Sequence, residues 1–203
     1  MANKKWSFVD VDTQADFMLP GAKLYVPAAE KLLPVLQRLR DFAAQHAIPV
    51  LSTTDAHSTD DAEFRDWPPH CVRQTPGQLK VPETLFRDYL VVPRERSAPP
   101  SDEELARYPQ WIVEKNQLDM FSTPHAEDLV SRLDAEEYLL YGVATEYCVR
   151  LAALGLRKRG RRVLLLTDAI QGIDAAGIAR TLEELKNAGV VLSTTREIFA
   201  AAA

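Results

Sequence analysis

Short runs of apolar residues recur along the chain, and between them the apolar positions follow a helical period. Most of these runs are too apolar to leave one face in water, which is typical of parallel strands covered on both sides. Six runs are predicted as strands: residues 6–12, 48–54, 110–115, 137–143, 162–168 and 190–194. A weaker run, residues 89–93, fits either an edge strand or an extended loop.

The segments between the strands predict helices. In residues 28–45 the apolar side chains form one stripe with charged residues opposite, and Pro34 lies inside it, so the regular helix is expected to begin or bend there. The same period occurs in residues 124–133, 145–159 and 175–188.

Several residues mark the ends of these helices. Gly160 and Gly189 stand at positions typical of helix C-caps, and Ser101 followed by Glu104 indicates a capping box before a short helix. The terminal alanine run, residues 200–203, is expected to be a frayed end.

This alternation predicts a single domain over residues 1–203, a three-layer α/β/α sandwich around a six-stranded, mainly parallel, doubly wound sheet. Loops with several prolines, at 66–82 (which also holds Gly77) and at 93–100, are expected to form a site within that domain, since the strand pattern continues after them.

Composition and charge narrow the classes of function. With Lys+Arg 24 against Asp+Glu 29 the net charge is −5, which argues against a nucleic-acid surface. No stretch of eighteen apolar residues occurs, and charges precede any long apolar run at the N-terminus, so neither a membrane span nor a signal peptide is expected. Two cysteines cannot build a disulfide framework. We therefore expect a cytoplasmic protein.

Ionisable residues stand at the ends of four predicted strands. Ligands in open α/β sheets bind beyond the carboxyl ends of the strands, so side chains at those ends are expected to converge. The first strand leads to Asp12, the second to Asp55 and His57, the third to Lys115, and the fourth to Cys148.

Cys148 is the candidate nucleophile. It follows a strand and a tight turn at the start of a predicted helix, where the helix dipole is expected to lower the thiol pKa and free backbone N–H groups can form an oxyanion hole. The alternative is a small buried hydrophobic residue on an apolar helix. Taken with Cys148, Asp12 as a base and Lys115 as its partner would make a Cys–Asp–Lys triad. Alone, Asp12 is better explained as a helix cap or a loop-ordering residue, and Lys115 fits a solvated lysine equally well.

Asp55, Ala56 and His57 form a D-x-H pattern at the end of an extended segment. Residues two apart in a strand point the same way, so both side chains can meet one ion. His70, which follows two prolines, is a candidate third ligand, and this ligand set suits zinc, iron or manganese. Cys71 is better explained as a structural residue than as a fourth ligand, because adjacent side chains in an extended loop point apart.

Four blocks of sequence resemble the nicotinamidases, which belong to the isochorismatase-like cysteine hydrolases. They are DVDTQADF at 10–17, TTDAH at 53–57, WPPHCV at 67–72 with TPG at 75–77, and GVATEYCV at 142–149. The blocks span nearly the whole chain in the family's order. Gln78 to Lys80 and the long segment between Gly77 and Lys115 depart from the family pattern.

The resemblance implies a role for each matching residue. It implies a catalytic triad of Asp12, Lys115 and Cys148, a metal site of Asp55, His57 and His70, and substrate contacts from Phe17, Trp67, Val143 and Tyr147, with Phe17 and Trp67 on either side of an aromatic ring. It also implies an oxyanion hole made by the backbone N–H groups of Ala144 and Cys148, with a cis peptide bond before Ala144.

The expected activity is therefore a metal-assisted cysteine amidase that converts nicotinamide to nicotinate and ammonia. The expected cofactor is one divalent transition metal, zinc before iron or manganese; the expected partners are a small amide substrate and, by resemblance, further copies of the chain. An enzyme acting on a ureido or carbamoyl compound and a non-catalytic small-molecule-binding domain are the alternatives. The vinyl-ether-cleaving isochorismatases are disfavoured, because they lack the D-x-H and the second histidine.

Overall fold

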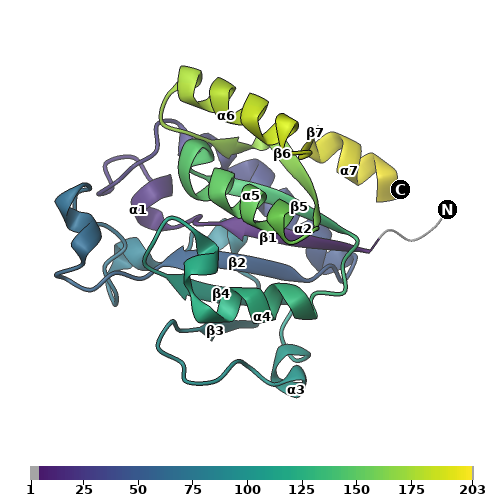
Figure 1. Cartoon of the computed structure of the whole chain (residues 1–203), viewed down its shortest axis with the longest axis horizontal. Coiled ribbons are helices and arrows are strands. Elements are labelled where there is room, and N and C mark those ends of the chain that lie inside the picture. Colours follow the sequence, from purple (N-terminus) through teal and green to yellow (C-terminus); the bar gives the residue numbers. More distant parts are fainter. Residues whose placement is uncertain (1–4, 203) are drawn as a thin grey trace.

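A computed structural model describes residues 5–202 and contains one sheet of seven parallel strands (Figure 1). The order across the sheet is β3-β4-β2-β1-β5-β6-β7. The strands are β1 (Trp6–Val11), β2 (Val50–Asp55), β3 (Tyr89–Val92), β4 (Gln110–Lys115), β5 (Glu137–Val143), β6 (Arg162–Gln171) and β7 (Val191–Ser193).

All six predicted strands are present, and the prediction of six is one short because the weaker run forms β3. This strand pairs only with β4 and lies at the edge of the sheet, with Tyr89 and Val91 exposed. One face of an edge strand meets water, which explains its weaker apolar pattern.

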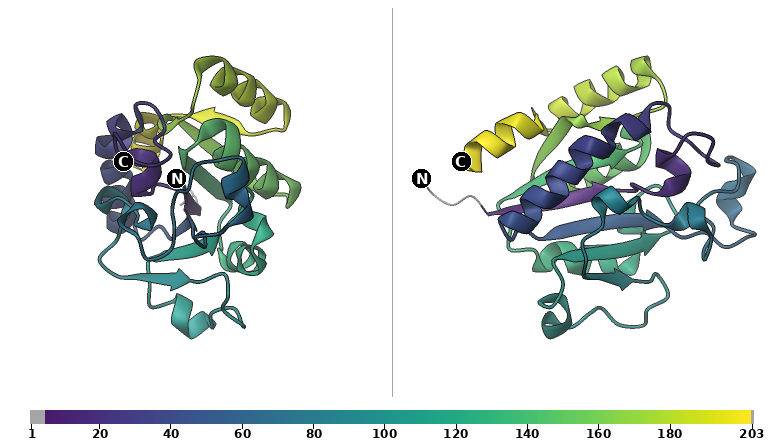
Figure 2. Two further views of the ribbon diagram at one scale, coloured as in Figure 1. Left: turned by 90° about the vertical axis from the view of Figure 1, so that its left-hand side faces the viewer. Right: turned by 180° about the vertical axis from the view of Figure 1, so that it is seen from behind.

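Helices cover both faces of the sheet, as the two views in Figure 2 show. The helices are α1 (Ala15–Met18), α2 (Leu33–Gln45), α3 (Asp102–Leu105), α4 (Pro124–Arg132), α5 (Arg150–Lys158), α6 (Ala175–Asn187) and α7 (Thr195–Ala202). One core cluster joins α4, α5 and α6 to one face of the sheet, and a second joins α2 and α7 to the other. The three-layer prediction is confirmed.

Two helical predictions need correction. The segment 145–159 is not one regular helix: Thr145–Val149 forms a π-helical turn, and α5 begins only at Arg150. The terminal alanines at 200–202 lie within α7 and are not frayed; Ala203 is outside the described residues.

The predicted helix ends are confirmed. Pro34 lies in the first turn of α2, after a 3₁₀ turn over Ala29–Leu32. Gly160 and Gly189 have φ of +72° and +81° after α5 and α6, and the Ser101 hydroxyl accepts a hydrogen bond from the Glu104 N–H. None of the described helices is long and apolar enough to cross a membrane.

Candidate active site

The carboxyl ends of the four neighbouring strands β4, β2, β1 and β5 bring four ionisable side chains together. Lys115 and Asp55 are the last residues of β4 and β2 and are paired in register, while Asp12 directly follows β1. Cys148 lies in the π-helical turn after β5. The chain crosses from one half of the sheet to the other between β4 and β5, so these side chains surround the switch point of the sheet.

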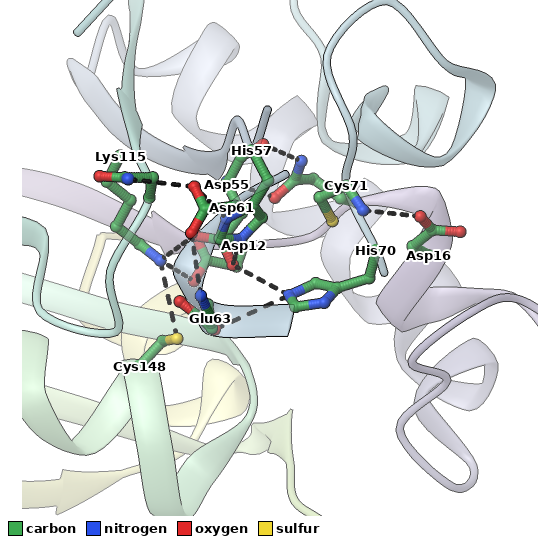
Figure 3. Close-up of polar contacts among 12 residues, drawn as sticks. Asp12, Asp16, Asp55, His57, Asp61, Glu63, His70, Cys71, Lys115 and Cys148 are labelled. Carbon is green, nitrogen blue, oxygen red and sulfur yellow. Dashed lines mark hydrogen bonds and ion pairs between the residues drawn. The ribbon is translucent and has the colours of Figure 1, made fainter. Parts of the chain in front are cut away.

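The Lys115 ammonium is the centre of this group (Figure 3). Its Nζ lies 2.8 Å from Asp12 Oδ2, 2.5 Å from Asp55 Oδ1 and 3.7 Å from Cys148 Sγ. All four side chains are buried. A cation between two carboxylates and a thiol stabilises the ionised forms of its neighbours.

Burial and charge act in opposite directions on these groups. Burial disfavours the Lys115 ammonium, but the carboxylates of Asp12 and Asp55 outweigh it and raise the pKa of Lys115 well above its usual value. Burial raises the pKa of the Cys148 thiol well above its usual value, although Lys115 opposes this. The expectation of a lowered pKa for Cys148 is wrong, because burial outweighs the turn and the ammonium. A raised pKa favours the protonated thiol, so attack by this sulfur would require a base to take its proton.

Asp12 is held in position by its neighbours. Its backbone has a φ of +50°, a conformation that is rare for residues other than glycine. The Thr53 hydroxyl donates a hydrogen bond to Asp12 Oδ1 at 2.6 Å. The Asp12 N–H in turn donates to the hydroxyl and carbonyl oxygens of Thr53. This orientation leaves Oδ2 directed at Lys115, beside the Cys148 thiol.

Asp55 joins the Lys115 group to a second cluster. Its Oδ1 contacts Lys115, while its Oδ2 lies 4.0 Å from both His57 Nε2 and His70 Nε2. His57 Nε2 is buried and has no hydrogen-bond partner among the described residues. A buried carboxylate and two imidazoles around one point, with a nitrogen left unsatisfied, fit a divalent transition metal.

The surroundings of the two histidines favour metal binding. The structure places His70 Nδ1 2.8 Å from the Pro68 carbonyl oxygen, which orients Nε2 toward Asp55. His57 Nδ1 lies 3.2 Å from Asp61 Oδ2. Burial lowers the pKa of both histidines, and the neutral imidazole is the form that binds metals.

Two acidic residues of this cluster were not predicted. The Asp61 carboxylate lies next to His57 Nδ1, and Glu63 Oε1 is 4.0 Å from His70 Nε2. Both belong to an acidic stretch at 59–66 in which no spacing distinguishes one carboxylate from the next. Their proximity to the histidines arises only because the loop folds back over β2.

Asp12, Asp55 and Cys148 also lie close enough to form a metal-ligating group. The Lys115 ammonium already occupies their centre, and a second cation beside it would be repelled. Cys71 is not part of the Asp55–His57–His70 group: its Sγ faces the Gly77 carbonyl, and burial raises the pKa of its thiol. Both observations favour the structural interpretation of Cys71.

A pocket opens beside Cys148. The residues predicted to contact the substrate all line it: Phe17, Trp67, Val143 and Tyr147. So do Ala144, Asp55, His70 and Cys148, together with residues that the sequence did not single out, namely Leu24, Val26, Glu63, Leu118 and Ile173. The Trp67 and Tyr147 rings meet edge to face, 5.4 Å apart. The Val143–Ala144 peptide bond is cis, as the resemblance implies.

Residues 8–197 match the family model described as the isochorismatase domain. The chain belongs to the isochorismatase family. It is 25% identical to a nicotinamidase of Escherichia coli, with 91% of this chain and 92% of that protein aligned. It is 27% identical to a nicotinamidase/pyrazinamidase of Mycobacterium tuberculosis, over 92% and 97% of the two chains. A pyrazinamidase of Pyrococcus horikoshii in complex with zinc superposes with a TM-score of 0.76 at 29% identity, covering 94% of this chain and 99% of that one.

Proposed function

We propose that this isochorismatase-family hydrolase is a nicotinamidase, which hydrolyses nicotinamide to nicotinate and ammonia and also accepts pyrazinamide. The observation that carries the proposal is a buried Cys148–Asp12–Lys115 group whose Cys148 lines a largely apolar pocket, beside a cluster of one aspartate and two histidines. The named relatives are nicotinamidases and pyrazinamidases.

In the proposed mechanism, Asp12 takes the proton of the Cys148 thiol, and the thiolate attacks the carboxamide carbon of the substrate. The Lys115 ammonium lies within 3.7 Å of the sulfur and stabilises the thiolate as it forms. The tetrahedral oxyanion accepts hydrogen bonds from the backbone N–H groups of Ala144 and Cys148. Asp12 then donates its proton to the leaving ammonia, which leaves a thioester on Cys148.

Hydrolysis of the thioester completes the cycle. Asp12 takes a proton from water as the water oxygen attacks the thioester carbon, and it returns that proton to the sulfur when the carbon–sulfur bond breaks. The product acid loses its own proton to solvent and leaves as nicotinate. Asp55, His57 and His70 would hold a divalent metal, zinc in the first instance, which supplies a Lewis-acidic point for orienting the substrate. Asp55 contributes one oxygen to that site and the other to Lys115.

The charge of the pocket wall favours a neutral aromatic amide over a ureido acid. None of the pocket-lining residues in the described chain is Lys or Arg, whereas Asp55 and Glu63 are both present. A substrate that carries its own carboxylate would find no Lys or Arg side chain at this wall, so a metal held by Asp55, His57 and His70 would be its one cationic partner there, beside two acidic side chains. Nicotinamide carries no charge, and its flat ring suits a wall that includes Phe17 and Trp67.

The deciding experiment measures ammonia release from nicotinamide, pyrazinamide and N-carbamoylsarcosine with the same zinc-loaded protein. We expect the two aromatic amides to be hydrolysed and the ureido acid to be at least about a hundredfold slower. Faster release from the ureido acid would favour the alternative of a carbamoyl-compound hydrolase. No release from any of the three would favour the non-catalytic binding domain.

A further inference from the structure

Ile173 is a large apolar side chain that is 41% exposed and yet lines the pocket. It lies in the short loop between β6 and α6, which ends at Asp174, the N-cap of α6. Single exposed apolar side chains are common on protein surfaces, so the exposure of Ile173 matters here because its side chain lines the pocket, where it can contact a bound substrate.

Glu146 fixes the backbone of this loop. Its Oε1 accepts hydrogen bonds from the N–H groups of Ile173 at 2.9 Å and Asp174 at 3.0 Å, and its Oε2 lies 3.1 Å from the Ile173 nitrogen. Hydrogen bonds from N–H groups to a carboxylate are stronger than those between neutral groups. The carboxylate also lies near the N-terminus of the 13-residue helix α6, where negative charge is favourable.

The loop has glycine, which carries no Cβ atom, where the Glu146 carboxylate packs against it. A Cβ atom on Gly172 would lie 2.1 Å from Glu146 Oε2, and one on Gly177 would lie 3.0 Å from Glu146 Cγ. These glycines let the loop and the first turn of α6 close around Glu146. The fit shows that the contact is built into the loop rather than made by a mobile surface side chain.

Glu146 itself belongs to the turn that carries the reactive groups. It lies in the π-helical turn Thr145–Val149, between Ala144 and Cys148. The loop that bears Ile173 is therefore tied to the same turn that positions the proposed nucleophile and the proposed oxyanion hole. Movement of one against the other would break the Glu146 hydrogen bonds.

We propose that Ile173 determines the size of the amide that the pocket accepts, and that Glu146 is the positioning residue that holds Ile173 across the pocket mouth. The choice of substrate rests on the proposed function, whereas control of access to Cys148 does not. The amide taken is then one with a single ring and no bulky ring substituent.

Access to Cys148 is tested by alkylation with two reagents of different size, iodoacetamide and N-ethylmaleimide, with the modified cysteine identified by mass spectrometry. The ratio of the two rate constants cancels any change in the reactivity of the thiol itself. We expect Ile173→Ala and Glu146→Ala each to raise the maleimide-to-iodoacetamide ratio at Cys148 by about tenfold. Glu146→Gln, which keeps one acceptor oxygen, should restore most of the wild-type ratio.

The matched control is Glu197→Ala. Glu197 also accepts a backbone hydrogen bond at the start of a helix, from the Thr194 N–H, but Thr194, unlike Ile173, does not line the pocket. Its removal should leave the ratio unchanged. Ile173→Ala alters an exposed side chain, so it tests the proposal even if Glu146→Ala fails to fold. An unchanged ratio in Ile173→Ala overturns the proposal, and a rise in that variant without a rise in folded Glu146→Ala overturns the role of Glu146.

Turnover gives the second measurement. Wild-type protein should prefer nicotinamide to a ring-methylated nicotinamide by about tenfold or more, and Ile173→Ala should narrow this preference. Glu146→Ala should narrow it too, with KM for nicotinamide rising more than kcat falls. If nicotinamide is not hydrolysed but the alkylation ratios change as expected, the proposed function is wrong and control of access stands. If nicotinamide is hydrolysed and the ratios do not change, only the role of Ile173 and Glu146 is wrong.

Discussion

Two buried lysine–aspartate ion pairs lie near the carboxyl end of β1. They differ in the hydrogen bonds made to the charged atoms and in what lies beside them. Lys80 Nζ lies 2.8 Å from Asp10 Oδ2, and Lys115 Nζ lies 2.8 Å from Asp12 Oδ2. The two aspartates are two residues apart, and all four side chains are at most 2% exposed. The ion pairs have the same composition and the same distance, so their chemistry alone does not distinguish a structural pair from a reactive one.

The Lys80 pair is fully enclosed by hydrogen bonds. Lys80 also donates to the Thr13 hydroxyl at 2.7 Å, and Asp10 accepts from Thr13 and from Ser52. The network continues through Thr84 to the next strands of the sheet. Neither this pair nor its hydrogen-bond partners Thr13 and Ser52 line the pocket, whereas Cys148 beside the Lys115 pair does, so the Lys80 pair joins the loop after residue 78 to β1 and has no contact with a ligand site.

The Lys115 pair is incomplete. Asp12 Oδ2 accepts no hydrogen bond of good geometry among the described residues, although the Lys115 ammonium is close, and the Cys148 thiol beside it lines the pocket. A carboxylate oxygen with spare capacity next to a thiol can receive a proton. The comparison teaches that unsatisfied atoms and contact with a pocket mark the reactive pair, whereas burial and charge do not.

The largest effect is expected from removing the thiol at the reactive pair. Cys148→Ala should lower amide turnover by at least about 10⁴-fold, because the covalent intermediate can no longer form. The measurement is ammonia release, with the melting temperature as a check on folding. Cys71→Ala is the matched control, since Cys71 is equally buried but faces the Gly77 carbonyl. Full activity of Cys148→Ala would end the covalent mechanism.

The second-largest effect is expected in metal content, at the site where His57 Nε2 has no hydrogen-bond partner among the described residues. Protein purified without chelator should carry about one divalent transition metal per chain, and the double variant His57→Ala/His70→Ala should carry almost none. Elemental analysis of the purified protein measures this directly. His46→Ala is the control, because His46 is exposed at the end of α2 and its ring packs at a tilt against Phe42, away from the metal site. A double variant that keeps its metal would show that the ion binds elsewhere.

The convergence of the site could be predicted from the sequence because it depends on the sheet. Asp12, Asp55, Lys115 and Cys148 each follow an apolar run, and parallel strands place their carboxyl ends at one edge of the sheet. The strand β3 was harder to predict for the opposite reason: with Tyr89 and Val91 exposed, it lacks the continuous burial that identifies the other strands.

Contacts made by loops with other parts of the fold could not be predicted. Lys80 with Asp10, Glu63 with His70, and Glu146 with Ile173 each join segments whose separation in sequence carries no period. The raised pKa of Cys148 was missed for a related reason, because a helix start predicts the direction of a dipole but not the depth of burial. The π-helical turn that replaces the expected α-helix at 145–149 likewise has no signature in hydrophobic spacing.

The third prediction tests whether the Lys80–Asp10 pair is structural. Lys80→Met leaves Asp10 buried without its cation, so the free energy of unfolding should fall by about 3–5 kcal/mol, measured by urea titration. Turnover per folded molecule should be retained. The double variant Asp10→Val/Lys80→Leu removes both charges and should recover most of the lost stability. If the double variant is stable but inactive, the pair also positions Asp12, and the division between structural and reactive pairs fails.

The smallest effect concerns the wall of the pocket above the reactive pair. Trp67 lines the pocket and packs edge to face on Tyr147, so Trp67→Ala should remove one aromatic face from a bound ring. An aromatic contact contributes about 0.5–1.5 kcal/mol beyond burial, so we expect kcat/KM for nicotinamide to fall about tenfold, mainly through KM. Tyr89→Ala on the exposed edge strand β3 truncates an aromatic outside the pocket and should leave kcat/KM unchanged. The fall in kcat/KM should be smaller for an aliphatic amide than for nicotinamide. An equal fall for both substrates would mean that Trp67 shapes the pocket without stacking on the substrate.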